Sequence, residues 1–115
     1  MFLYKDMLIT LARNKKGEEA MQVWKDMKAE NIHVDQHTYA DIIQTFLDHE
    51  SPSEAINLYE EMRQSPDLPL ELPYRVILKG LLPYPLLRKK VKQDFEELFP
   101  DIQLNDLPEE LFDEH

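Results

Sequence analysis

The sequence predicts an all-α fold, an α-α superhelix built from helical hairpins, and three observations indicate it. First, a 35-residue unit occurs twice in succession, at 1–35 and 36–70, and apolar residues coincide when the two are superposed. Second, the apolar positions of the second helix in each unit recur with the spacing of one helix face. Third, the chain has two glycines and no cysteine, so it contains neither a Gly-rich nucleotide loop nor a disulfide framework. Such a period is typical of stacked repeats, in which no unit can bury its apolar face alone.

The two units match most closely in their second halves, where EEAMQVWKDM aligns without a gap with SEAINLYEEM. Tyr4 then falls on Tyr39, and Trp24 falls on Tyr59. A third, degenerate unit can be placed over 71–100 with one inserted residue. We therefore predict two regular repeats followed by one degenerate closing hairpin, which is near the lower limit for a stable solenoid.

The first unit predicts two helices joined by a short turn. The first runs from Leu3 to about Arg13 and ends at the breaker NKKG, and the second runs from Glu18 to about Glu30. Carboxylates in the first turn of the second helix favour the positive end of the helix dipole. Two helices separated by so short a turn form a helical hairpin.

The second unit repeats this plan with a different turn, HESPSE. Ser51 can cap the following helix, Pro52 takes the first helical position, and Glu54 completes a capping box. The helix then carries a stripe of apolar residues with helical spacing. We predict a second hairpin over 36–70.

Prolines interrupt the third unit. Those at positions 66, 69 and 73 lengthen the linker before it, and Pro83 and Pro85 separate its two helices. Its last helix, from about Leu86 to Phe99, has basic residues (RKKVK) near its start and acidic residues (DFEE) near its end. Because these charges oppose the helix dipole, packing must hold the helix in place.

The acidity of the chain lies at its C-terminal end. The formal net charge is −10, yet all 13 basic residues lie at or before Lys92, and nine acids follow it. The repeats are therefore nearly neutral, which argues much less against a polyanionic partner than −10 does. For the acidic tail at 101–115 we expect disorder or loose docking, with a capping helix or a partner motif as the alternatives.

The period and the repeated residues resemble the pentatricopeptide repeat family. The likeness is carried by EEAMQVWKDMKAENIHVD, HTYADIIQTFL and SEAINLYEEM, with Tyr at unit position 4, Ala at 20 and Met at 27. Asn31 and Val34 stand where the family has glycine and proline. The tetratricopeptide alternative has a 34-residue period and a different opening helix, which is not seen here. The degenerate last unit suggests the C-terminal piece, or a short form, of such a protein.

The resemblance implies binding of single-stranded RNA along the face lined by the first helices, with roughly one base per repeat. In the family, unit positions 5 and 35 read the base, position 2 stacks on it, and a cation near position 13 meets phosphate. Carried over by position, the RNA-contact candidates are Phe2, Lys5, Arg13, Asp35, His37, Ala40 and Arg75.

The carried-over pairs depart from the family's pattern. The family usually has a small polar residue at position 5, where this chain has Lys5 and Ala40. Leu70 stands at position 35 of the second unit and, like Ala40, has no side-chain donor or acceptor, so no base code is legible there. Asp48 stands where a phosphate-binding cation is expected. These departures favour the alternative of a protein-interaction scaffold that uses the same surface or the exposed first edge.

The remaining patterns do not indicate catalysis, a metal site or a membrane span. The serines fall at turns or helix ends, where capping explains them, and His33 and His37 straddle the turn between units. Trp24 is expected to pack in the core rather than to stack on a base. The basic clusters, which are Lys15 with Lys16 and RKKVK at 88–92, are expected to be solvated, with contact to an RNA backbone or a membrane surface as the alternatives. No apolar run approaches about 20 residues.

We therefore expect a non-catalytic, RNA-associated repeat protein that has no cofactor, metal or small-molecule substrate. By resemblance it would act in an organelle, the mitochondrion above all, in RNA processing, stability or translation. Its partners would be single-stranded RNA or proteins of an RNA-handling complex. The start of the chain is already in the repeat register, so we expect no transit peptide ahead of it.

Overall fold

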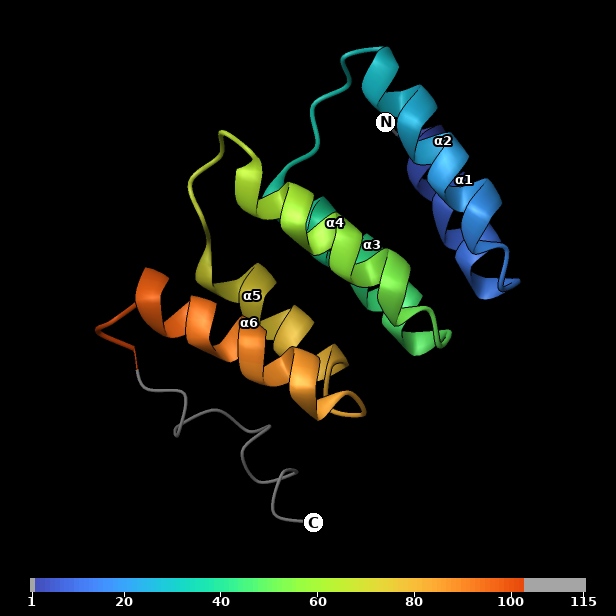
Figure 1. Cartoon of the computed structure of the whole chain (residues 1–115). Coiled ribbons are helices and arrows are strands. Elements are labelled where there is room, and N and C mark those ends of the chain that lie inside the picture. The colour runs from blue at the N-terminus through green and yellow to red at the C-terminus, as the bar shows by residue number, and fades with distance from the viewer. Residues whose placement is uncertain (1, 103–115) are drawn as a thin grey trace.

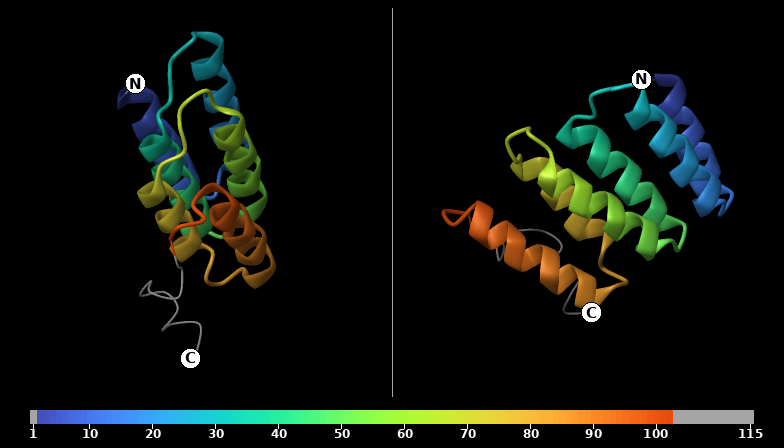
Figure 2. Two further views of the ribbon diagram at one scale, coloured as in Figure 1. Left: turned by 90° about the vertical axis from the view of Figure 1, so that its left-hand side faces the viewer. Right: turned by 45° about the horizontal axis from the view of Figure 1, so that its top comes forward.

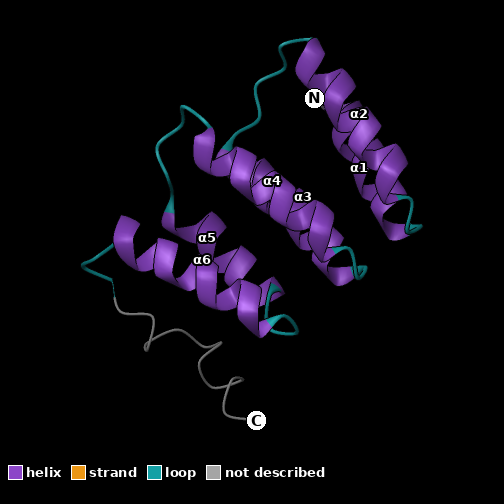
Figure 3. Ribbon diagram, in the orientation of Figure 1, coloured by secondary structure: helices purple, strands orange, loops and turns teal. Residues whose placement is uncertain are grey.

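The computed structural model of the chain describes residues 2–102, which form helices joined by turns (Figures 1 and 3). Within this range there are six helices and no strand, as predicted: α1 (Phe2–Arg13), α2 (Gly17–Ala29), α3 (Gln36–Asp48), α4 (Pro52–Gln64), α5 (Glu71–Gly80) and α6 (Pro85–Leu98). Of the acidic tail predicted at 101–115, residues 103–115 lie outside the described part.

The six helices make three hairpins stacked in two layers. The first helices of the hairpins, α1, α3 and α5, pack side by side, and each also packs against the second helix of its own hairpin. Figure 2 shows α2, α4 and α6 forming the other layer. This arrangement is the predicted solenoid of helical hairpins, and it presents the first helices as one continuous surface.

The helix starts agree with the predicted breaks, with one correction. Pro52 begins α4 and Pro85 begins α6, since the first turn of a helix tolerates a residue without an N–H. The predicted capping box at Ser51 is wrong, because Ser51 precedes α4 but its side chain makes no capping hydrogen bond. Pro73 lies in the first turn of α5, where it does not break the helix.

Three residues after helix ends adopt the left-handed backbone conformation. Asn31, in place of the family's glycine, has φ 59°, which asparagine tolerates better than most residues. Lys15 and Glu50 have φ 57° and 62° and occupy the same place in the first two units. The first two hairpins therefore turn by the same backbone geometry, although their turn sequences differ.

The core runs through all three hairpins as one cluster. Trp24 is 2% exposed, which confirms the prediction that it is a core residue. One expectation for the basic cluster of α6 was wrong: Arg88 is buried, and its Nε donates a hydrogen bond to the Leu78 carbonyl at 3.2 Å. That bond ties α6 to α5 within the third hairpin.

Aromatic side chains join successive hairpins. Trp24 packs edge-on against Tyr39, with ring centroids 5.3 Å apart, and Tyr59 packs in the same way against Tyr74 at 6.1 Å. These contacts link unit position 24 of one repeat to position 4 of the next. Such edge-to-face pairs stabilise by about 0.5–1.5 kcal/mol beyond the area they bury.

Phe99 ends this series of ring contacts. Its ring lies 5.0 Å from Phe95 and 5.9 Å from Tyr74. Phe95 has the register position of Trp24 and Tyr59, but among the described residues it takes its ring contact from Phe99 of its own hairpin rather than from the tyrosine of a following repeat.

Candidate functional site

The layer of first helices contains most of the RNA-contact candidates, and the structure shows which of them are available. His37 and Arg13 are exposed, at the start of α3 and in the last turn of α1. Phe2 begins α1, but its side chain lies outside the described part of the structure.

Lys5 lies between two first helices. Its Nζ is 3.0 Å from Asp41 Oδ2, so the ion pair bridges α1 and α3. The Lys5 side chain is 29% exposed. A phosphate that approached Lys5 would therefore compete with an existing carboxylate partner.

Ala40 has no exposed surface to offer. It is only 2% exposed and belongs to the core cluster, so its side chain cannot contact a base in this conformation. The inclusion of Ala40 among the contact candidates is corrected on this ground. The sequence could not show it, because the residue lies on the edge of the buried stripe of α3.

Arg75 is partly buried on α5. One guanidinium nitrogen, Nη2, is paired with Glu71 one turn earlier in the same helix. Its Nε is buried and has no hydrogen-bond partner among the described residues. Because this donor is buried, it is not accessible to a ligand in this conformation.

Asp35 has a structural role that explains its identity. It is the N-cap of α3, and its Oδ1 accepts a hydrogen bond from the Thr38 backbone N–H at 2.8 Å. That hydrogen bond lowers the pKa of Asp35 below 3.8, and nearby His37 and His33 lower it further. The carboxylate stays exposed, so the cap does not exclude contact with a ligand.

A hollow of about 480 Å³ lies between the C-terminal ends of α3 and α5. Beside this hollow α5 approaches α3 closely at Gly80, where an added Cβ would lie 3.1 Å from Leu47 Cδ1. Asp48, Glu50 and Lys79 are the charged residues that line it. The mixed charges give this hollow no clear preference for phosphate.

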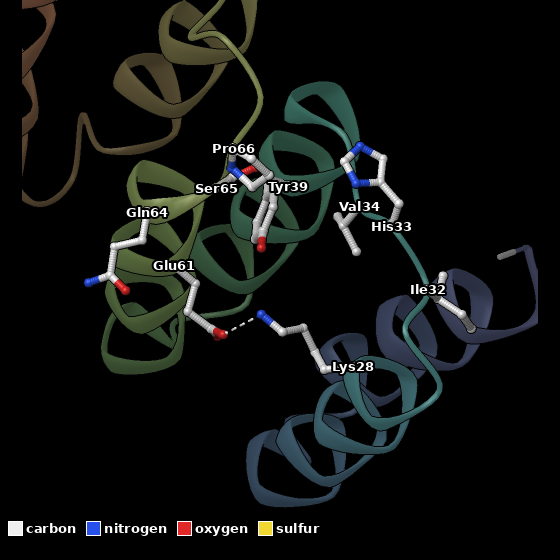
Figure 4. Close-up of a pocket in the computed structure, with 9 residues that line it drawn as sticks. All are labelled: Lys28, Ile32, His33, Val34, Tyr39, Glu61, Gln64, Ser65 and Pro66. Carbon is white, nitrogen blue, oxygen red and sulfur yellow. Dashed lines mark hydrogen bonds and ion pairs between the residues drawn. The ribbon is translucent and has the colours of Figure 1, made fainter.

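A second hollow of about 270 Å³ lies where the first two repeats meet, on the side of the second helices (Figure 4). Two side-chain contacts lie at this hollow, one between Lys28 and Glu61 and one between His33 and Asp67. Lys28 Nζ is 3.0 Å from Glu61 Oε1, and His33 Nε2 is 3.0 Å from Asp67 Oδ2.

Tyr39 lines this hollow with its hydroxyl group. In the first repeat the equivalent Tyr4 donates a hydrogen bond to Glu30, but the second repeat has Ser65 at the place of Glu30. The Tyr39 hydroxyl has no hydrogen-bond partner among the described residues. Burial, with help from Glu61 and Asp67, raises the pKa of Tyr39 to about 12, so the hydroxyl remains a donor at neutral pH. The sequence signal for this hollow was the change from Glu30 to Ser65.

No group of His, Cys, Asp and Glu residues able to hold a metal ion occurs within residues 2–102. No helix in that range is long and apolar enough to cross a membrane. His33 and His37 are both exposed.

Three stacked helical hairpins, joined by position-24 aromatic residues, define a helical-repeat protein. The family model described as pentatricopeptide repeat-containing protein matches residues 3–101, and the chain belongs to this family of RNA-associated helical-repeat proteins. Pentatricopeptide repeat-containing protein At1g62350 of Arabidopsis thaliana is 60% identical to it over 111 residues. The match covers 96% of this chain and 57% of that relative, so the chain spans less than two thirds of the relative's length.

Proposed function

We propose that the chain binds single-stranded RNA through the layer formed by α1, α3 and α5, without catalysing a reaction. The observation that carries the proposal is the position of Arg13 and His37. Both are exposed on this layer of a pentatricopeptide repeat protein, at the register positions of phosphate and base contacts. The cellular role that follows is processing, stabilisation or translation of organellar, specifically mitochondrial, transcripts.

The contact should be weak. Base stacking and edge contacts contribute about 1–3 kcal/mol per base. Three repeats engage two or three bases, so after the costs of association the dissociation constant should be micromolar or weaker. Lys5 and Arg75 already have carboxylate partners, which reduces their contribution further.

A protein-interaction scaffold is the second candidate function. Its support is that the position-5 residues are either buried or paired: Ala40 lies in the core, Lys5 is bound to Asp41, and Arg75 to Glu71. A surface whose charges are satisfied internally suits a protein partner better than a polyanion.

The test is binding of a randomised single-stranded RNA pool by the full chain across a salt series. We expect micromolar affinity that weakens with salt, because phosphate contacts release counterions. Arg13→Ala and His37→Ala should each weaken binding about threefold to tenfold. Lys25→Ala, which removes an exposed cation from α2 in the other layer, is the matched control and should change little.

Two results would contradict the proposal. One is the absence of binding at tens of micromolar, which would favour the scaffold. The other is an equal loss from Lys25→Ala and Arg13→Ala, which would mean that attraction is diffuse rather than located on the first-helix layer.

A further inference from the structure

The side chain of Tyr39 is only 4% exposed, yet its hydroxyl has no hydrogen-bond partner among the described residues. The equivalent hydroxyl of the first repeat, on Tyr4, donates a hydrogen bond to the carboxylate of Glu30. Glu30 is the C-cap of α2, and Ser65 is the C-cap of α4 at the same register position. The second repeat therefore has the donor of this hydrogen bond but lacks the anion that accepts it.

The hollow of about 270 Å³ between the first two repeats lies where that anion is lacking. Ser65 lines it together with Tyr39, whose hydroxyl points toward the side where Lys28 and Glu61 lie (Figure 4). Lys28 supplies an ammonium group and His33 an imidazole to the same hollow. The hollow thus holds three groups able to donate a hydrogen bond to an anion attached to Ser65.

A phosphorylated serine has the right length to supply this anion. The same number of bonds separates Cα from a terminal oxygen in phosphoserine and in glutamate. The two C-caps also have similar φ angles, −87° at Glu30 and −63° at Ser65, so the Cα–Cβ bond leaves the helix end in a similar direction. A phosphate on Ser65 should therefore reach the Tyr39 hydroxyl as Glu30 reaches that of Tyr4.

Ser65 also has the sequence context and the exposure of a kinase substrate. It is partly exposed at the start of the linker between α4 and α5, its backbone is extended (ψ 146°), and Pro66 follows it, as proline-directed protein kinases require. Ser51 also precedes a proline, but Pro52 already belongs to α4, and the Ser51 N–H donates a hydrogen bond to a carbonyl of α3 at 2.8 Å. Because kinases bind their substrates as extended segments, Ser65 is the better substrate of the two.

We propose that Ser65 is a phosphorylation site, and that its phosphate is held in this hollow by the Tyr39 hydroxyl and the Lys28 ammonium group, with His33 as a further donor. A proline-directed protein kinase supplies ATP. The Ser65 Oγ forms a bond to the terminal phosphorus, the bond from that phosphorus to the bridging oxygen breaks, ADP leaves, and the hydroxyl proton goes to a base of the kinase. The product carries a charge of about −1.5 to −2 and three acceptor oxygens.

Two carboxylates and a helix end oppose this phosphate. Glu61 and Asp67 lie near the hydroxyl that would hold it, and like charges repel. The C-terminal end of α4 is also the negative end of its dipole. Both carboxylates, however, already have partners in Lys28 and His33, and Glu30 shows that an anion is accommodated at the same helix position beside a tyrosine. The proposal therefore predicts that stability depends on the donors of the hollow once the phosphate is present, rather than a large net gain.

The experiment treats the full chain with a proline-directed kinase and ATP, locates the phosphate by mass spectrometry, and compares melting temperatures with and without it. We expect modification of Ser65 in the folded chain and little of Ser51. In the unmodified chain Tyr39→Phe should shift the melting temperature by less than about 2 °C, because the hydroxyl has no partner to lose. In the phosphorylated chain the same substitution should lower it by roughly 4–8 °C, since a charge-assisted hydrogen bond is lost.

Three further variants make the comparison specific. Tyr4→Phe, which removes the equivalent hydroxyl of the first repeat, is the matched control and should lower the melting temperature equally with and without phosphate. Lys28→Gln should lower it more in the phosphorylated chain than in the unmodified one. Ser65→Glu places a carboxylate of the same length in the hollow, so it should make the melting temperature sensitive to Tyr39→Phe without any kinase.

Two results would overturn the proposal. One is the absence of phosphate from Ser65 in the folded chain, whether or not a free peptide of residues 60–70 is phosphorylated by the same kinase. The other is an equal effect of Tyr39→Phe with and without phosphate, which would mean that the phosphate lies in solvent rather than in the hollow.

Discussion

The two interfaces between successive repeats share one plan but differ in their exposure to water. In both, a second-helix aromatic residue packs against the tyrosine of the next repeat and donates a hydrogen bond to a carboxylate: Trp24 to Glu61, and Tyr59 to Asp94 at 2.7 Å. In both, a lysine ammonium lies over the donor ring, 5.6 Å from the Trp24 centroid and 5.4 Å from that of Tyr59.

The carboxylates of the two interfaces have different surroundings. Glu61 is 35% exposed and borders the hollow shown in Figure 4. Asp94 is 13% exposed and also pairs with Arg63 at 3.0 Å and with Lys90. Burial and the hydrogen bond to Asp94 raise the pKa of Tyr59 well above its usual value. The second interface is thus a closed network, while the first keeps room for solvent or a ligand.

Removal of the Trp24 ring or the Tyr59 ring should have the largest effect on the free energy of unfolding. Trp24→Ala and Tyr59→Ala each leave a cavity in the core, which should lower the free energy of unfolding by about 3–5 kcal/mol. Denaturant unfolding followed by far-UV circular dichroism measures this. Trp24→Phe keeps most of the packing and should lose far less. If Trp24→Ala lost under about 1 kcal/mol, the ring would not hold the first interface together.

Substitution of the two carboxylates, one at a time, should lower the free energy of unfolding by different amounts at the two interfaces. Asp94→Ala strands the Tyr59 hydroxyl and removes a partner of Arg63, at an expected loss of about 2–3 kcal/mol. Glu61→Ala should lose about 1 kcal/mol, because water can replace the carboxylate at the open hollow. The same denaturation measurement compares them. Equal losses would contradict the distinction between a closed and an open interface.

The linkers before α3 and α5 allow a test of capping. Asp35 caps α3, whereas Leu70, at the same register position before α5, makes no capping hydrogen bond and is 43% exposed. Asp35→Ala should lower the free energy of unfolding by about 1 kcal/mol, and Leu70→Asp should raise it by about 0.5–1 kcal/mol. No gain from Leu70→Asp would show that the backbone before α5 cannot accept a cap.

The Asp35 effect should depend on pH in one direction. Its folded-state pKa is lowered below 3.8, so its contribution is present at higher pH and is lost as pH falls through the folded pKa. The difference between the unmodified chain and Asp35→Ala, about 1 kcal/mol at pH 7, should therefore shrink as the pH falls below 3.8. Asp35→Asn, which caps without ionising, should show no such loss at position 35. Titration of stability by denaturant at several pH values measures both.

The smallest effect is expected at the turns. Lys15 and Glu50 lie 3.5 Å apart with side chains 69% and 78% exposed, so solvent screens their attraction. Lys15→Ala should change the free energy of unfolding by less than about 0.5 kcal/mol. A loss above about 1 kcal/mol would mean that this pair stabilises the first interface in a way that its exposure does not suggest.

The sequence predicted the hairpins because their signals are local. Helix periodicity and the 35-residue repeat are visible in the letters, and so is the core position of Trp24. The carboxylate partners of Trp24 and Tyr59 were not predictable, because they do not share a register position. Glu61 lies at unit position 26, whereas Asp94, once the inserted residue is allowed for, lies one helical turn earlier in its unit. Which turn of α6 faces Tyr59 depends on how the third hairpin packs, and that is a property of the assembled fold.

Candidate contacts were harder to predict for the same reason. The register correctly placed Lys5 and Arg75 on the first-helix layer, but it could not show that Asp41 and Glu71 occupy them. Ala40 was misjudged because its burial depends on the neighbouring helices. The register position predicts the helix on which a side chain lies, whereas its exposure and its partners depend on the neighbouring residues in the folded chain.

The place of Phe99 distinguishes the third hairpin from the first two. Trp24 and Tyr59 each pack against the tyrosine of the following repeat, whereas the ring that packs against Phe95 among the described residues is Phe99 of the same hairpin. Phe99 also packs on Tyr74, so it ties the end of α6 to the start of α5. The third hairpin therefore completes its aromatic contacts with residues of its own.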